Sequence, residues 1–155
     1  MPIAVEVVSK ERKVFEEAAA DMVVVPASEG IMGVLPNHAP VLTTLGFGEL
    51  IIRKGGAEER FAIYGGVVDV RPTKVTILAE LAESSFDLDY DAIDKAKAEA
   101  AATMAKGVAG LPEEQNRALS FSLKRAELAE RIMAKIRTRG TTMRIVEQTE
   151  RDARK

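Results

Sequence analysis

The sequence contains no cysteine and only one histidine, His38. Without cysteine there are no disulfides, thiolate metal ligands or cysteine nucleophiles, and one histidine cannot form a two-histidine metal site. Aromatic residues are 5% of the chain and tryptophan is absent, so a surface that stacks nucleic acid bases is not expected. No apolar run reaches the roughly 18 residues of a membrane span, and we expect no secretory signal or transit peptide. The cytosol or the cytosolic face of a membrane is the expected location.

The sequence also lacks the motifs of common catalytic sites. It has no Gly-x-x-x-x-Gly-Lys phosphate-binding loop and no Gly-x-Ser-x-Gly nucleophile turn. Its carboxylates are spread over the expected surface, where charged side chains are normally solvated. We therefore expect no metal site and no cofactor, and no motif marks a catalytic residue.

Composition divides the chain near residue 88 into two unlike parts. Residues 1–88 hold 13 of the 15 valines and 8 of the 11 glycines, whereas residues 89–155 hold 13 of the 23 alanines. Valine favours strands and alanine favours helices. The first part has 13 acids and 8 bases, a net charge of −5, and the second has 11 acids and 14 bases, a net charge of +3. We predict an α+β chain with an acidic β domain over residues 1–87 and a basic helical domain over residues 88–155.

Short apolar runs separated by turn residues predict the strands of the first domain. The runs are 3–8, 13–15, 22–25, 31–35, 41–45, 50–53, 60–64, 67–70 and 75–79. Glycines at 46, 48, 65 and 66 are expected to separate some of them. Many short strands with no helical period are typical of an antiparallel β-sandwich or barrel.

Two helices are predicted in the second domain, joined by a short loop that makes them antiparallel. Asp87 or Asp89 is expected to cap the first, over 92–106, and the second is expected to run from Pro112 to about Arg139. The second helix has an apolar stripe at helical spacing, made of Leu119, Leu123, Ala126, Ala129, Met133 and Ile136. Alanine-rich helices without large aromatic anchors bury little area, so this hairpin should be marginal alone and should dock on another surface or move.

The loop Pro36-Asn37-His38-Ala39-Pro40 is stiffened by its two prolines. Three interpretations of His38 stay open at this point. It is a turn residue bonded to nearby backbone, or part of a rigid loop that contacts a partner, or a catalytic base. The last lacks a nucleophile paired with it by any motif.

Positive charge is concentrated on the second predicted helix. Residues 117–144 carry eight bases and two acids, a net charge of +6. Bases near a helix C-terminus complement the helix dipole, which explains Arg137 and Arg139 without a partner. The same charges also suit an acidic partner. Nucleic acid is a competing partner, but the acidic neighbouring domain and the lack of interleaved aromatics argue against it.

Two segments resemble the signatures of a known family. Residues 29–43, EGIMGVLPNHAPVLT, are similar to the signature loop of the epsilon subunit of bacterial F-type ATP synthases, the subunit that mitochondria call delta. Residues 64–70, YGGVVDV, with 75–80, VTILAE, resemble the second signature. Asp87-Leu88-Asp89 resembles the usual domain junction. The matches follow the family's order and spacing, and the family's layout covers nearly the whole chain.

The resemblance implies a ten-stranded β-sandwich followed by an α-helical hairpin, in a non-catalytic subunit of the rotating central stalk. The implied partners are the gamma subunit, the ring of membrane c subunits, and the alpha and beta subunits. The signature loop would face the c ring, with Ile31, Pro36, Asn37 and His38 as contacts. Some members carry an acid where Ile31 stands, so an ion pair with the ring is not expected here.

The resemblance also implies regulation by the hairpin. In bacterial members it packs beside the sandwich or extends along gamma and inhibits ATP hydrolysis. Its inhibitory basic residues would then be Lys124, Arg125, Arg131, Lys135, Arg137 and Arg139, facing an acidic segment of beta. Some members bind ATP through an Ile/Leu-Asp-x-x-Arg-Ala motif, aligned here with residues 121–126. Arg125 is retained but Ser122 replaces the aspartate, so we expect weak ATP binding at most.

Two alternatives remain, a stand-alone adaptor that binds peptides and an ATP-responsive sensor. On the preferred interpretation the protein is peripheral at the cytoplasmic side of a bacterial inner membrane, and it associates with the membrane only through the complex. The charged tail, residues 141–155, receives no role from the sequence.

Overall fold

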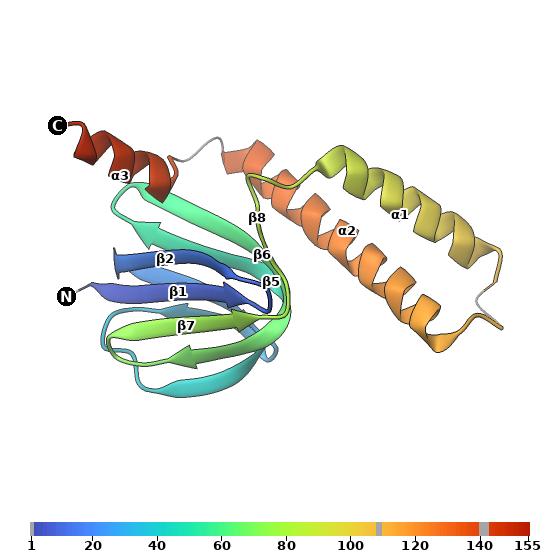
Figure 1. Cartoon of the computed structure of the whole chain (residues 1–155), viewed down its shortest axis with the longest axis horizontal. Helices are drawn as coiled ribbons and strands as arrows, with labels where there is room; N and C mark the ends of the chain where they lie inside the picture. The colour runs from blue at the N-terminus through green and yellow to red at the C-terminus, as the bar shows by residue number, and fades with distance from the viewer. Residues whose placement is uncertain (1, 108–109, 140–142) are drawn as a thin grey trace.

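The computed structural model describes residues 2–107, 110–139 and 143–155. Within them eight strands form a β-sandwich, and three helices follow (Figure 1). The strands are β1 Ile3–Ser9, β2 Lys13–Ala20, β3 Met22–Ala27, β4 Gly30–Val34, β5 Val41–Lys54, β6 Ala57–Val70, β7 Lys74–Ala79 and β8 Ala82–Ser84. The helices are α1 Tyr90–Ala105, α2 Glu113–Arg139 and α3 Ile145–Ala153. The prediction of a β-sandwich followed by a helical hairpin is confirmed.

The strands form one sheet that folds over to enclose an aliphatic core. Their order is β2-β1-β7-β6-β5-β3-β4, with β8 paired to β6. The pairs are antiparallel except for β1 and β7, which run parallel with Val5 opposite Val75. Alternate residues of β1 point inward, so Ile3, Val5 and Val7 are buried. This is the period-2 pattern of a strand with one face on the core.

The described residues contain eight strands where the resemblance implied ten, because β5 and β6 are each 14 residues long. Each passes through glycines that the sequence analysis expected to end strands. A Cβ on Gly48 would lie 2.4 Å from the side chain of Pro26, and a Cβ on Gly66 would lie 2.2 Å from the carbonyl oxygen of Leu78. These glycines allow neighbouring strands to approach closely while the ladder continues.

The two predicted helices form, and a third follows them. Asp89 caps α1 by accepting a hydrogen bond from the N–H of Ala92 at 3.0 Å, as the sequence predicted. Helix α2 lies against β5 and β6, beside α1. Helix α3 falls in the segment that received no role, and it packs on the sandwich away from α1 (Figure 1).

Candidate interaction surfaces

A cluster of three aromatic rings joins the sandwich to α2. Phe47 of β5, Tyr64 of β6 and Phe121 of α2 pack with centroid distances of 5.6 to 5.7 Å. Such edge-on and tilted pairs add stability beyond their buried area. Leu128 and Ile132 extend the contact along α2, and both are buried. The expectation that the hairpin lacks aromatic anchors is therefore wrong at this surface.

An ion pair closes the edge of this cluster. Arg125 of α2 donates a hydrogen bond from Nη2 to Oε1 of Glu83 on β8, and the Tyr64 hydroxyl donates to Oε2 of Glu83 at 3.2 Å. Burial and the negative charge of Glu83 raise the pKa of Tyr64 to about 12. Burial alone would lower the pKa of Arg125, but the contacts with Glu83 outweigh it and the pKa is raised. These groups fix the position of α2 on the sandwich.

Helix α1 packs on another side of α2 through small residues. Ile93 of α1 is buried against Ala126 and Ala129, which belong to the predicted apolar stripe. Leu128 and Ile132 lie outside that stripe, yet they make the buried contact with the sandwich. Because α2 packs on α1 and on the sandwich at once, its buried surface is wider than one stripe.

Strand β4 and the loop that follows it present the residues predicted to contact the c ring. Ile31 is 79% exposed, Asn37 is exposed, and Pro36 and His38 are half-buried. Asn37 has φ of 67°, a left-handed conformation that asparagine tolerates, and its N–H donates to the carbonyl of Pro72 at 2.8 Å. The Nδ1 of His38 donates to the carbonyl of the next residue at 2.7 Å. This loop is a firmly held turn with an exposed apolar residue beside it.

A second exposed apolar surface lies on the outer face of β5, β6 and β7. Leu42 is 73% exposed and Leu78 is 50% exposed. Leu42 of β5 lies opposite Asp69 of β6, and Leu78 of β7 lies opposite Val67 of β6. Asp69 and Val67 are two residues apart on β6 and therefore point to the same face, so the two leucines do as well. Exposed apolar residues that share a face are typical of a protein contact.

Two of the predicted basic residues contact the sandwich. Arg125 is bound to Glu83, and Nζ of Lys124 lies 5.8 Å from the centre of the Phe47 ring. Ser122, the other residue predicted for weak ATP binding, is half-buried on α2. A phosphate group would have to displace the Glu83 carboxylate from Arg125, so the geometry adds no support for a nucleotide site.

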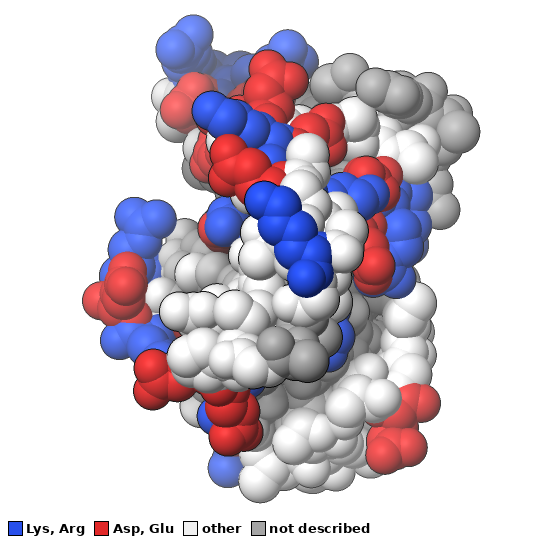
Figure 2. Space-filling view, turned by 90° about the vertical axis from the view of Figure 1, so that its right-hand side faces the viewer, with Lys and Arg blue, Asp and Glu red and all other residues white. Residues whose placement is uncertain are grey.

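The remaining basic residues lie further along α2. Arg131 and Lys135 are exposed, and the side chains of Arg137 and Arg139 lie outside the described residues. Figure 2 shows Lys and Arg intermingled with Asp and Glu on the side of the molecule where the hairpin lies. Lys97 on α1 forms an ion pair with Glu130, an acid of α2, and so ties the two helices of the hairpin together. The positive charge of α2 is offset in the folded hairpin where Arg125 pairs with Glu83 of the sandwich.

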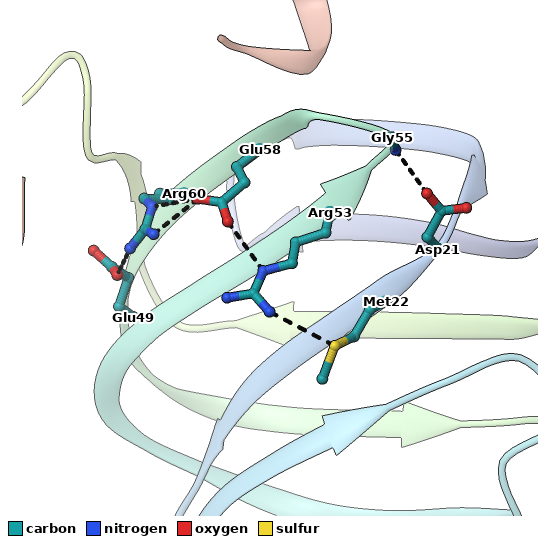
Figure 3. A network of polar contacts seen from close by, with 7 residues as sticks. All are labelled: Asp21, Met22, Glu49, Arg53, Gly55, Glu58 and Arg60. Carbon is teal, nitrogen blue, oxygen red and sulfur yellow. Dashed lines mark hydrogen bonds and ion pairs between the residues drawn. The ribbon is translucent and has the colours of Figure 1, made fainter. Parts of the chain in front are cut away.

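A network of charged residues crosses β5 and β6 (Figure 3). Arg60 donates to Glu49 at 2.6 Å and to Glu58 at 2.8 Å, and Arg53 donates to Glu58 at 3.0 Å. Burial would raise the pKa of Glu58, but Arg60 and Arg53 outweigh burial and the pKa is lowered. Carboxylates and guanidinium groups pair along the network, which indicates a structural role.

Among the residues that the structure describes, no group of three or more His, Asp or Glu residues is placed to hold a metal ion. In the same part of the chain, no helix combines the length and apolar character needed to cross a membrane. Sequence reasoning missed the contact residues Phe47, Tyr64 and Glu83, because nothing in their local sequence marks which strand positions face a helix.

Comparison with known proteins identifies the family. The family described as "ATP synthase, Delta/Epsilon chain, beta-sandwich domain" matches residues 2–85. An ATP synthase epsilon chain of Halorhodospira halophila is 41% identical over 138 residues, which cover 88% of this chain and 91% of that protein. One of Roseiflexus sp. is 48% identical over 101 residues, covering 65% and 68%. A chain in the cryo-EM structure of the Euglena gracilis mitochondrial ATP synthase (OSCP/F1/c-ring) shares the fold with a TM-score of 0.72 and 23% identity, covering 85% of this chain and 81% of that one. The chain therefore belongs to the family of ATP synthase delta and epsilon chains.

Proposed function

We propose that this chain works as the epsilon subunit of an F-type ATP synthase, a non-catalytic part of the rotating central stalk. The observation that carries the proposal is its 41% identity to an epsilon chain over 138 residues, a length that includes both sandwich and hairpin. The complex is membrane-bound, and the chain would join it as a peripheral protein on the cytoplasmic side of a bacterial inner membrane. No observation favours the stand-alone adaptor.

Two surfaces of the sandwich suit fixed contacts with other stalk subunits. The firmly held turn with exposed Ile31 would meet the c ring through Ile31, Pro36, Asn37 and His38. A rigid loop loses little conformational freedom on binding, which favours affinity. The apolar face of Leu42 and Leu78 would pack on another subunit, for which gamma is the proposed partner.

The hairpin would regulate hydrolysis by leaving its place on the sandwich. Extended, its basic residues would no longer face the acids of the folded form and would be free to meet an acidic segment of the beta subunit, within reach of alpha. Arg125 would first have to part from Glu83. This gives inhibition a defined structural requirement, which is separation of α2 from the aromatic cluster.

The sandwich contacts are tested by purifying the complex through a tagged gamma subunit. Leu42→Asp together with Leu78→Asp should reduce the amount of this chain that is retained, because two charges would enter an apolar contact. Met104→Asp on α1 is the matched control, since it places an acid at another exposed apolar residue. Equal retention of all three chains, or recovery of the parent chain as a free monomer, would contradict the proposal.

The inhibitory role is tested in the assembled enzyme with Arg131→Gln and Lys135→Gln in one chain. Arg125 is left intact because its loss would also weaken docking. ATP hydrolysis should rise, most clearly at low ionic strength where screening is weak. The control is Lys95→Gln with Lys106→Gln, which removes the same charge from exposed positions outside the basic helix. If both pairs have the same effect across a salt series, an acidic partner for α2 is ruled out.

A further inference from the structure

Helix α3 returns from the end of α2 and docks on the sandwich. Ile145, its first residue, is 1% exposed and belongs to the same core as the strands. The N–H of Glu58 on β6 donates to the carbonyl of Met143 at 2.9 Å, just before the helix. Figure 1 shows α3 over one end of the sandwich, clear of α1. The segment thus closes the sandwich core with an apolar residue and extends the hydrogen bonding of β6.

A buried ion pair fixes this docking. Glu59 of β6 has no exposed surface, and its carboxylate accepts hydrogen bonds from Nε and Nη2 of Arg144 at 3.2 and 3.1 Å. The N–H of Val146 donates to the same carboxylate at 3.4 Å. The Arg144 guanidinium also lies 4.5 Å from the centre of the Phe86 ring. Among the described residues, every hydrogen bond to the Glu59 carboxylate comes from the segment 144–146.

Removal of α3 would leave the buried Glu59 carboxylate without the Arg144 guanidinium. A carboxylate that loses its only counter-charge inside a protein is strongly unfavourable, so the segment 144–146 must stay or the site must admit water. The Glu59 carboxylate also holds the Arg144 guanidinium and raises the pKa of Arg144. The docked arrangement is thus defined by matched charges, while Ile145 adds apolar burial.

The chain length between α2 and α3 couples this docking to the hairpin. Arg139 ends α2 and Ile145 begins α3, six residues further on. Six Cα–Cα steps span at most about 23 Å in any conformation. Helix α2 has 27 residues and is about 40 Å long. An extension that carries the C-terminal end of α2 further than this from the sandwich cannot occur while α3 is docked.

We propose that α3 is a latch, which holds the hairpin folded until the segment 144–146 leaves Glu59. The inference rests on the proposed regulatory role of the hairpin and adds a second event to it. Release of the aromatic cluster alone frees the middle of α2, whereas full extension also needs α3 to detach at the other end of the sandwich.

The latch is tested by single-molecule fluorescence transfer in the isolated full-length chain. Because the sequence has no cysteine, dyes can be placed at Lys10→Cys on the sandwich and Glu114→Cys on α2, both exposed positions. Arg144→Gln should raise the fraction of molecules with α2 away from the sandwich at least tenfold. Arg151→Gln, an exposed change on the same helix, is the matched control and should leave the fraction unchanged.

A second variant guards against damage to the sandwich by an unpaired Glu59. Ending the chain at residue 139 removes α3 and lets water reach Glu59, and it should raise the same fraction by a similar factor. If both Arg144→Gln and the shortened chain keep the parent fraction, the latch is overturned.

The opposite variant fastens the latch. A Cβ on Gly55 would lie 3.4 Å from Nε2 of Gln148 on α3, so Gly55→Cys with Gln148→Cys can be joined by a short bis-maleimide. Gly55 has a left-handed φ of 57°, which strains a cysteine, and the unjoined double-cysteine subunit carries the same strain. The joined subunit in the assembled enzyme should lose its inhibition of ATP hydrolysis, and the unjoined subunit should keep it. If the unjoined subunit inhibits hydrolysis and the joined subunit inhibits it equally, the latch is overturned. If the unjoined subunit does not inhibit hydrolysis at all but the fluorescence changes appear, the latch stands and the inhibitory function fails.

Discussion

Replacing Ile132 with alanine should free the hairpin from the sandwich without unfolding the sandwich. Ile132 is 1% exposed and packs with Ala62, Tyr64 and Leu128. The change removes three buried carbon atoms, worth about 2.4 kcal/mol at about 0.8 kcal/mol each, and the cavity left behind adds to the cost. We expect about 3 kcal/mol in all, which weakens docking about 100-fold.

Hydrogen exchange of the intact chain measures this effect element by element. Amides of α2 should exchange about 100-fold faster in Ile132→Ala, because a poorly docked hairpin of alanine-rich helices frays. Amides in the middle of β5 and β6 should keep their protection. The matched control is Ile31→Ala, which deletes the same atoms from a residue that is 79% exposed and should change little. If sandwich and hairpin lose protection equally, the two form one cooperative unit and the reasoning fails.

Three further predictions concern single contacts. The pKa of Tyr64 is raised to about 12, above the value near 10 of an unfolded tyrosine, so the docked state favours the neutral phenol. The stability that this contributes is complete below pH 10 and is lost as the pH rises through 12. Absorbance titration of a Tyr90→Phe chain should show one phenolate near pH 12. Asn37→Val should lower the melting temperature by a few degrees, because its left-handed φ of 67° costs a β-branched residue about 1 to 2 kcal/mol, whereas Asn37→Gly should change it little. Arg125→Glu should weaken docking of α2, and adding Glu83→Arg should restore it in part. In a double-mutant cycle measured by hydrogen exchange of α2 amides, the coupling energy should be about 1 kcal/mol. Zero coupling would rule out the ion pair as an anchor.

Local sequence chemistry predicted the elements well where the cause was local. The cap of α1 by Asp89 depends on one side chain and the next three residues, so the sequence contains it. The expectation that the glycines of β5 and β6 separate strands is wrong, because the role of these glycines depends on neighbouring strands that are distant in sequence. Gly66 is set against the carbonyl of Leu78 on β7, and a sequence does not reveal whether a glycine ends a strand or admits a neighbouring one.

The contacts that fix the helices could not be predicted, because they join distant positions. Glu59 lies between Glu58 and Arg60 in what looks like an exposed charged run. On a strand these residues alternate between faces, so Glu58 and Arg60 form the outer network while Glu59 points inward. Its partner Arg144 is 85 residues away, and nothing near either residue announces the pair. Charge counting included Arg144 in the basic stretch and so missed its buried role.

Two contacts hold the folded hairpin on the sandwich: the apolar side chains of α2, and the Glu59–Arg144 ion pair at α3. From α2, the side chains of Leu128 and Ile132 are buried against the sandwich, and at about 1.5 to 3 kcal/mol each they contribute about 3 to 6 kcal/mol. A shift from 1:99 to 99:1 needs about 5.5 kcal/mol, so a partner with contacts of similar size could reverse this docking. Breaking the Glu59–Arg144 pair from one side costs a further 3 to 5 kcal/mol or so, because it leaves a buried charge unpaired. If only α2 held the hairpin, binding of one partner could therefore release it from the sandwich. Because the chain continues into α3, the hairpin can extend only after α3 has also detached from the far end of the sandwich.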